Sequence, residues 1–166
     1  LVLAGGGGWT EKGKADVQAF CERENLPFAA LFRYHDIIDN YSPCYVGDAG
    51  VGMAQHISKA IEGADVILAV NARFGEATTK AWTLLDVPYP KQRIIQTHAS
   101  DAEIGKIYQP ELAIHAGPNQ FSAALLGMTL DGLHLAQRED WLAGLKTAYQ
   151  SSLRPPAQNS PVDMAA

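Results

Sequence analysis

The feature that most limits how this chain can fold is a short, unbroken apolar run, Val66-Ile67-Leu68-Ala69-Val70. A strand with one face in water alternates apolar and polar residues. This run is apolar throughout, which is typical of a strand covered on both faces in a parallel sheet. It is also far shorter than the roughly 20 apolar residues that cross a bilayer. The run therefore predicts a central strand with helices packed on both sides, and it does not predict a membrane partner.

The rest of the chain alternates between strand and helix patterns. Apolar segments predict further strands over residues 1–4, 28–32, 93–97 and 112–115. Helical periodicity predicts helices over 11–24, 51–62 and 139–150, with shorter helical segments before residue 85, at 101–107 and from 117 onwards. Residues 33–52 are predicted to be irregular, because proline and several glycines fall there. This alternation predicts an α/β fold, a Rossmann-like three-layer sandwich around a parallel sheet of five to six strands.

Composition narrows the class of protein further. The chain has 166 residues, 47% of them hydrophobic and 19% charged, so it can bury the core of one ordinary domain. Its net charge of −5 argues against nucleic acid or a membrane surface as partner, since both are polyanionic. Cys21 and Cys44 form neither a disulfide scaffold nor a CxxC zinc motif. With no recognisable signal peptide, we expect a reducing, cytoplasmic location.

The two ends of the chain suggest its domain organisation. We expect a compact domain over residues 1–150 and a linker over 151–166, because the last sixteen residues contain three prolines and no apolar periodicity. Leu1 already stands inside an apolar strand. We therefore expect a segment of a longer protein, with the linker leading into a further C-terminal domain.

Glycines at the end of the first predicted strand form the strongest local pattern. Residues Gly5 to Gly8 precede a predicted helix, and such a turn lets the backbone approach a phosphate at the helix N-terminus. Trp9, Thr10 and the late Gly13 interrupt the GxGxxG spacing. A tight turn that only packs helix against sheet is the alternative, and both interpretations stay open.

Polar residues follow three other predicted strands. Arg73 comes directly after the apolar run. There it could bind a ligand phosphate, lie in an interface, or form a surface ion pair with Glu76. His98 and His115 end neighbouring strands, but no third metal ligand is evident. The motifs GxSxG, HExxH and GxxxxGK[ST] do not occur. We therefore predict no catalytic residue and no metal site in this chain.

The order of the sequence blocks resembles a known family. The blocks are LVLAGGGG, YVGDAGVGM, ADVILAVNARFG, RIIQTHASDAEIGKIY and LAIHAG. Between Leu1 and Leu126 they resemble the central domain of thiamine-diphosphate-dependent enzymes, above all the acetolactate synthase (acetohydroxyacid synthase) large subunit. The resemblance implies a six-stranded Rossmann-like sheet of the type found in deoxyhypusine synthase and in NAD- and FAD-binding domains. It also implies a homodimer or homotetramer whose other domains bind thiamine diphosphate and Mg²⁺ and carry the catalytic residues.

The resemblance also assigns glycines to a dinucleotide site. Gly6, Gly7 and Gly8 match the family's glycine turn beside the phosphate and ribityl groups of FAD. Gly50 and Gly52 lie in the matching GxxG segment, although the His-Gly of FAD-binding members is Gly52-Met53 here.

The remaining family positions depart from the pattern at the adenosine end. Arg73 matches the arginine of the family's GARF motif, with Asn71 in place of its glycine. Two aspartates that bind the adenosine part are replaced by His98 and Ser100, and a third by Gly117. The central domain is purely structural in some members and binds FAD or ADP in others. The absence of these three aspartates favours a structural domain with at most a vestigial FAD or ADP site.

Two expectations complete the sequence-based hypothesis. Trp9, Trp82 and Tyr89 are predicted to pack against the other domains of the same enzyme, since large aromatics seldom stay exposed without a partner. The alternative from a different class is a stand-alone nucleotide-binding module of the sirtuin or deoxyhypusine-synthase sheet type. A catalytic glutamate upstream and a GDG…N segment downstream in the reading frame would distinguish the two.

Overall fold

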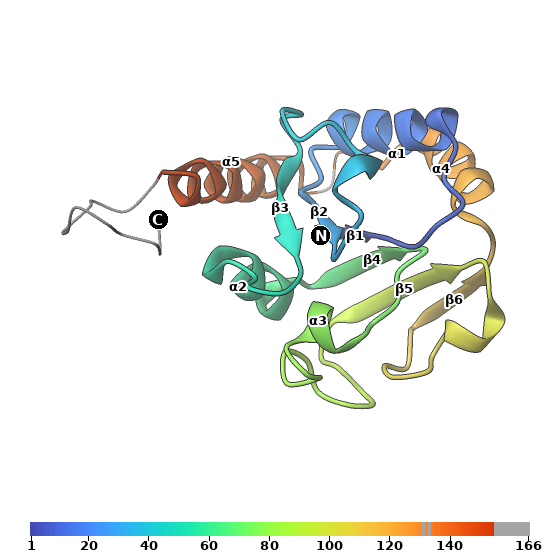
Figure 1. The fold of residues 1–166 in the computed structure, drawn as a ribbon. Helices are drawn as coiled ribbons and strands as arrows, with labels where there is room; N and C mark the ends of the chain where they lie inside the picture. Colours follow the sequence, from blue (N-terminus) through green and yellow to red (C-terminus); the bar gives the residue numbers. More distant parts are fainter. Residues whose placement is uncertain (131, 133, 155–166) are drawn as a thin grey trace.

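A computed structural model describes residues 1–130, 132 and 134–154, and its elements alternate along the chain (Figure 1). The strands are β1 (Val2–Ala4), β2 (Phe28–Leu31), β3 (Tyr45–Ala49), β4 (Val66–Val70), β5 (Arg93–His98) and β6 (Leu112–His115). The α-helices are α1 (Glu11–Arg23), α2 (Gln55–Gly63), α3 (Glu76–Thr79), α4 (Pro118–Leu126) and α5 (Leu135–Ser152). Two short 3₁₀ helices, η1 (His35–Ile37) and η2 (Asp101–Glu103), lie in connections.

All six strands pair in parallel, in the order β3-β2-β1-β4-β5-β6. The chain therefore fills one half of the sheet outwards from β1, crosses back, and fills the other half outwards from β4. This confirms the predicted Rossmann-like α/β fold, with six strands. The direction of winding reverses between β1 and β4, where Val2 lies beside Leu68. In open α/β sheets, ligands bind at the carboxyl end of such a switch point.

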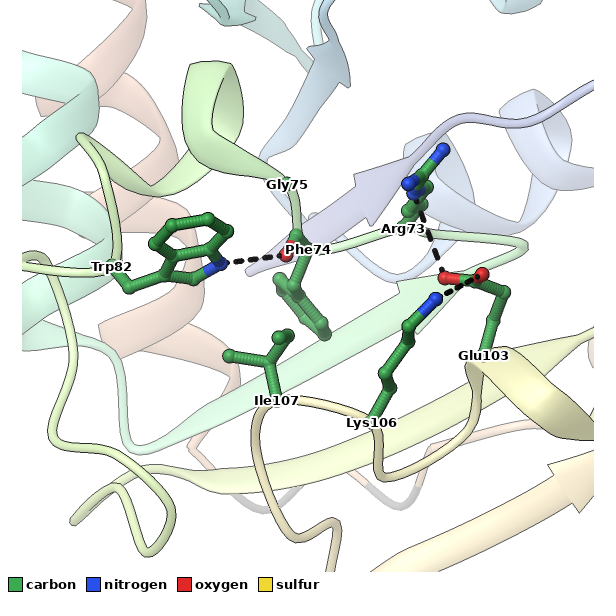
Figure 2. A pocket seen from close by; sticks show the side chains of 7 residues that line it. All are labelled: Arg73, Phe74, Gly75, Trp82, Glu103, Lys106 and Ile107. Atoms are coloured by element: carbon green, nitrogen blue, oxygen red, sulfur yellow. Dashed lines mark hydrogen bonds and ion pairs between the residues drawn. The ribbon is translucent and has the colours of Figure 1, made fainter.

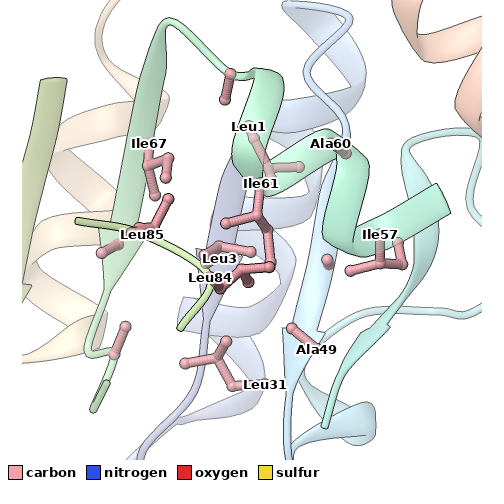
Figure 3. Packing of buried hydrophobic residues seen from close by; sticks show 14 of the residues in the cluster. Leu1, Leu3, Leu31, Ala49, Ile57, Ala60, Ile61, Ile67, Leu84 and Leu85 are labelled. Atoms are coloured by element: carbon pink, nitrogen blue, oxygen red, sulfur yellow. The ribbon is translucent and has the colours of Figure 1, made fainter. Parts of the chain in front are cut away.

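Helices cover the sheet on two sides, and each side has its own core. Val2 and Ala4 of β1 pack with Phe20 of α1 and Leu125 of α4. Leu3, which points to the opposite side, packs with the residues of α2 (Figure 3). Alternate side chains of one strand thus enter different cores, as expected for a buried parallel strand.

The covering is uneven across the second half of the sheet. The connections β4→β5 and β5→β6 both pack on the α2 side, through Leu84, Leu85 and Tyr108. On the α1 side, the first residues of β4 and β6 are not covered: Val66 is 38% exposed and Leu112 is 49% exposed. Part of one sheet face is therefore apolar and open among the residues that the structure describes.

Several predicted boundaries were wrong. The segment predicted to be irregular contains β3, whose Gly47 (φ 125°) and Asp48 are unusual in a strand. Helix α2 begins at Gln55 rather than near residue 51, and α5 begins at Leu135, four residues before the predicted start. The predicted helical turn at 101–107 is only the short η2.

The predicted linker is only partly visible. Helix α5 continues to Ser152, two residues into the segment assigned to the linker, and residues 155–166 lie outside the described part. Within the described ranges, no helix is both long and apolar enough to span a bilayer.

Candidate functional site

A cleft of about 590 Å³ opens at the carboxyl ends of the central strands. Its wall includes Gly6 and Gly7 after β1, Phe32 after β2, Arg73 after β4 and His98 at the end of β5. Four of the eight predicted site residues therefore meet at the switch point of the sheet.

Two residues of the glycine turn, Gly6 and Gly7, line this cleft. Gly6 (φ 66°) and Gly8 (φ 84°) have left-handed backbone conformations, which a side chain would strain. The carbonyl oxygens of Gly5, Gly7 and Gly8 accept side-chain hydrogen bonds at 2.8–2.9 Å, that of Gly5 from Trp9 Nε1. Within the described part of the chain, the amides of Gly6, Gly7 and Gly8 donate to no acceptor. Free amides of this kind form a concavity that suits an anion.

Asn71 connects this turn to the far side of the cleft. The side chain is buried and donates from Nδ2 to the carbonyl oxygens of Gly7 at 2.9 Å and Gly5 at 3.3 Å. Its Oδ1 accepts from the Ala99 amide at 3.3 Å. A Cβ on Gly6 would lie 2.4 Å from Asn71 Nδ2, so glycine is required for this close approach. Asn71 itself has φ 50°, which explains how it replaces the glycine of the family motif.

Asn119, at the start of α4, holds the other end of the turn. Its Nδ2 donates to the Gly8 carbonyl oxygen at 2.8 Å, and its Oδ1 accepts from both the amide and the hydroxyl of Thr10. Thr10 in turn caps α1 by accepting from the Gly13 amide at 3.1 Å. Sequence reasoning missed the roles of both asparagines, since these contacts join residues more than 60 positions apart.

Arg73 points to an acidic partner next to the cleft (Figure 2). Its Nε lies 3.6 Å from Glu103 Oε2, and Lys106 Nζ lies 3.0 Å from Glu103 Oε1. The hydrogen bond from Lys106, and more weakly the charge of Arg73, hold the pKa of Glu103 below its usual value. The ion pair considered for Arg73 thus forms with Glu103 and not with Glu76. The guanidinium stays mostly exposed and available to a ligand.

Trp82 stands between the cleft and a smaller pocket. Its Nε1 donates to the Phe74 carbonyl oxygen at 3.2 Å, and the indole lines both the cleft and the neighbouring pocket of about 100 Å³ (Figure 2). Trp82 is 38% exposed and Tyr89 is 76% exposed, whereas Trp9 is partly buried and bonded to the Gly5 carbonyl oxygen. That these aromatics pack against further domains remains a prediction.

The adenosine end of the predicted site is formed by His98 and Ser100, which contact each other. His98 Nδ1 accepts a hydrogen bond from the Ser100 amide at 2.9 Å, so this nitrogen is already engaged. His98 lies beside His115 across β5 and β6. Residues 1–130, 132 and 134–154 contain no group of three His, Cys, Asp or Glu side chains placed to hold a metal ion.

Gly50 and Gly52 are not part of the cleft wall. They follow β3, the edge strand, and neither lines the cleft. Gly50 is buried against Phe32 and Asp48, and Gly52 (φ 77°) has open space around it. Gly50 thus reaches the cleft only through Phe32, which lines it together with Gly6.

Fold and cleft together define a Rossmann-like α/β domain with a cleft at the switch point of its sheet. More specifically, residues 1–125 match the family model of the thiamine pyrophosphate enzyme central domain, and the chain belongs to that family. This confirms the resemblance recognised in the sequence.

Individual relatives point to the same family. The chain is 26% identical over 136 residues to a sulfoacetaldehyde acetyltransferase from Castellaniella defragrans, covering 82% of this chain and 23% of that protein. It is 24% identical over 147 residues to the acetolactate synthase large subunit of Parasynechococcus marenigrum (89% and 23%). It is 24% identical over 153 residues to that of Corynebacterium glutamicum (90% and 24%). The chain thus spans about a quarter of the length of these relatives.

Proposed function

We propose that this chain is the central, non-catalytic domain of a thiamine-diphosphate-dependent enzyme that decarboxylates a 2-keto acid or joins the resulting unit to an acceptor. The family match over residues 1–125 carries the proposal. The names of the relatives, acetolactate synthase and sulfoacetaldehyde acetyltransferase, support this reaction class. The chain spans about a quarter of the length of these relatives, so most of an enzyme of that length lies outside the matched segment. In this proposal, those other parts hold the cofactor and carry the chemistry.

Activity measurements test this division of labour. We expect the 166-residue chain to show no turnover of pyruvate with thiamine diphosphate and Mg²⁺, whereas the complete polypeptide is active under the same conditions. The folded state of the short chain is checked by circular dichroism, so that an unfolded sample is not mistaken for an inactive one. Turnover by the short chain above a buffer control would contradict the proposal.

The cleft is proposed to be a vestigial nucleotide site that binds FAD or ADP weakly at best. The phosphate half fits an anion, because the amides of the glycine turn are free and Arg73 is exposed. The ribose half does not fit well, because His98 and Ser100 replace paired carboxylate oxygens that suit a diol. Losing such hydrogen bonds weakens binding by a few kcal/mol, or roughly a hundredfold or more.

Calorimetric titration with FAD and with ADP tests the cleft. We expect a colourless protein and micromolar or weaker binding. Arg73→Gln should weaken any residual binding further, and Lys91→Gln, an exposed lysine outside the cleft lining, should not. Nanomolar FAD binding, or a yellow protein as isolated, would show that His98 and Ser100 bind the nucleotide well.

The partner is proposed to be the rest of the same polypeptide, in a homodimer or homotetramer. Parallel sheets are normally covered on both faces, yet Val66 and Leu112 stay exposed on the α1 side. The relatives are about four times as long as the matched segment, so an enzyme of that length would have ample chain to cover this face.

The same substitution, made in the 166-residue chain and in the complete polypeptide, tests whether other domains cover this sheet face. Leu112→Glu should leave the melting temperature of the 166-residue chain nearly unchanged but lower that of the complete polypeptide. Tyr41→Glu, at a residue 93% exposed, is the control that should be neutral in both. A neutral Leu112→Glu in the complete polypeptide would show that this face is not where the other domains pack.

A further inference from the structure

Three consecutive residues after α3 have an unusual backbone conformation. Lys80 (φ 49°), Ala81 (φ 55°) and Trp82 (φ 61°) all lie in the left-handed region, although none of them is glycine. Residues with a Cβ enter this region singly and at an energetic cost, so three in a row store backbone strain. Lys80 and Ala81 are exposed, so packing of their own side chains does not explain the conformation.

Contacts of Trp82 and its neighbours hold this left-handed turn in place. The hydroxyl of buried Thr79 donates to the Gly75 carbonyl oxygen at 2.9 Å and accepts from the Trp82 amide at 3.0 Å. The indole Nε1 of Trp82 donates to the Phe74 carbonyl oxygen at 3.2 Å. Two residues further on, Leu84 enters the core on the α2 side. The turn is therefore fixed between two buried residues, with Trp82 bound at both its amide and its indole.

The indole stands in the wall between two cavities. Arg73, Gly75 and Trp82 each line both the cleft of about 590 Å³ and the pocket of about 100 Å³ (Figure 2). Gly75 has no side chain, and Arg73 is directed toward Glu103, with 3.6 Å between Nε and Oε2. The indole is thus the large apolar part of this partition. Because Trp82 is partly exposed, it can move toward solvent without opening the core.

We propose that residues 80–82, named here the Trp82 latch, switch the cleft between a closed and an open state. In the closed state, the conformation described above, the hydrogen bonds of Trp82 offset the strain of the left-handed turn. In the open state the bond from Nε1 to the Phe74 carbonyl oxygen is broken, residues 80–82 become right-handed, and the indole moves into solvent. Cleft and pocket then form one cavity, so a ligand too large for the cleft alone selects the open state.

The exposed side chain of Ala81 allows the latch to be biased in both directions. Glycine adopts the left-handed conformation without strain, so Ala81→Gly should favour the closed state. A β-branched residue is strongly disfavoured there, so Ala81→Val should favour the open state. The matched controls are Ala143→Gly and Ala143→Val, at an exposed position in the right-handed helix α5.

Tryptophan fluorescence reports the state of the latch. In a Trp9→Phe, Trp141→Phe background, Trp82 is the only tryptophan of the protein. We expect the acrylamide quenching constant of Trp82 to rise about twofold or more with Ala81→Val, as the population shifts to the open state, and to stay equal or fall with Ala81→Gly. Neither Ala143 variant should change it.

Urea denaturation followed by circular dichroism tests the strain separately, in the chain with all three tryptophans. Ala81→Gly should raise the denaturation midpoint, whereas Ala143→Gly should lower it, because glycine is unfavourable inside a right-handed helix. This comparison holds even where Ala81→Val folds poorly. A lower midpoint for Ala81→Gly, or equal quenching of Trp82 in folded Ala81→Gly and Ala81→Val, would overturn the proposal.

Discussion

Asn71 is the residue whose removal should disturb the cleft most. Asn71→Ala deletes one hydrogen bond of 2.9 Å to Gly7 and two of 3.3 Å, to Gly5 and Ala99. We assign about 1 kcal/mol to the short bond and about 0.5 kcal/mol to each long one. Alanine in the left-handed conformation costs roughly 1 kcal/mol more. The expected loss is about 3 kcal/mol for Asn71→Ala and about 2 kcal/mol for Asn71→Gly, which avoids the backbone cost.

Asn25 is a matched control for the backbone contribution. It has φ 51°, nearly that of Asn71, but among the described residues its side chain makes one long hydrogen bond, of 3.5 Å to Glu139. Asn25→Ala should therefore cost roughly 1 kcal/mol and Asn25→Gly close to nothing. Free energies of unfolding come from urea denaturation followed by circular dichroism. If Asn71→Gly and Asn25→Gly agree within about 0.5 kcal/mol, the hydrogen bonds of Asn71 do not hold the glycine turn as argued.

Two further predictions concern helix packing and surface charge. Gly13→Ala should destabilise the protein by at least about 1 kcal/mol, because the new Cβ would lie 2.1 Å from Asn119 Oδ1. This loss outweighs the better helix propensity of alanine. As the control in the same denaturation assay, Gly144→Ala has open space around it and should stabilise the protein by roughly 0.5–1 kcal/mol. The hydrogen bond from Lys14 holds the pKa of Asp36 below its usual 3.8, so this pair stabilises the fold above that pH and the contribution is lost as the pH falls through the lower value. An NMR titration of the Lys14→Met variant should show the Asp36 pKa rising, and an unchanged value would refute the pairing.

The sequence allowed most of the fold to be predicted, because apolar strands and amphipathic helices leave local patterns. Five strands were found from short apolar runs, whereas β3 was missed. Its Gly47 and Asp48 are depleted in strands, and neighbours from α2 and α5 pack against that glycine. Tertiary packing, not local preference, makes this segment a strand.

The candidate site was predictable only where it depends on local geometry. The glycine turn follows from four consecutive glycines after a strand, and the structure places it at the switch point. The roles of Asn71 and Asn119 depend on contacts that join distant parts of the chain, and no local pattern encodes them. Gly50 and Gly52 were grouped with the turn by family resemblance, yet they follow the edge strand β3.

The position of β1 in the sheet has a consequence for how the protein is made. Because β2 and β3 lie on one side of β1 and β4 on the other, the first three strands can pair while the ribosome is still adding the rest. Until β4 emerges, the backbone of Val2–Ala4 is an unpaired, apolar edge of the kind that recruits other nascent chains. A substitution that slows the docking of β4 should therefore reduce the yield of soluble protein in cells more than it reduces the stability of molecules that finish folding.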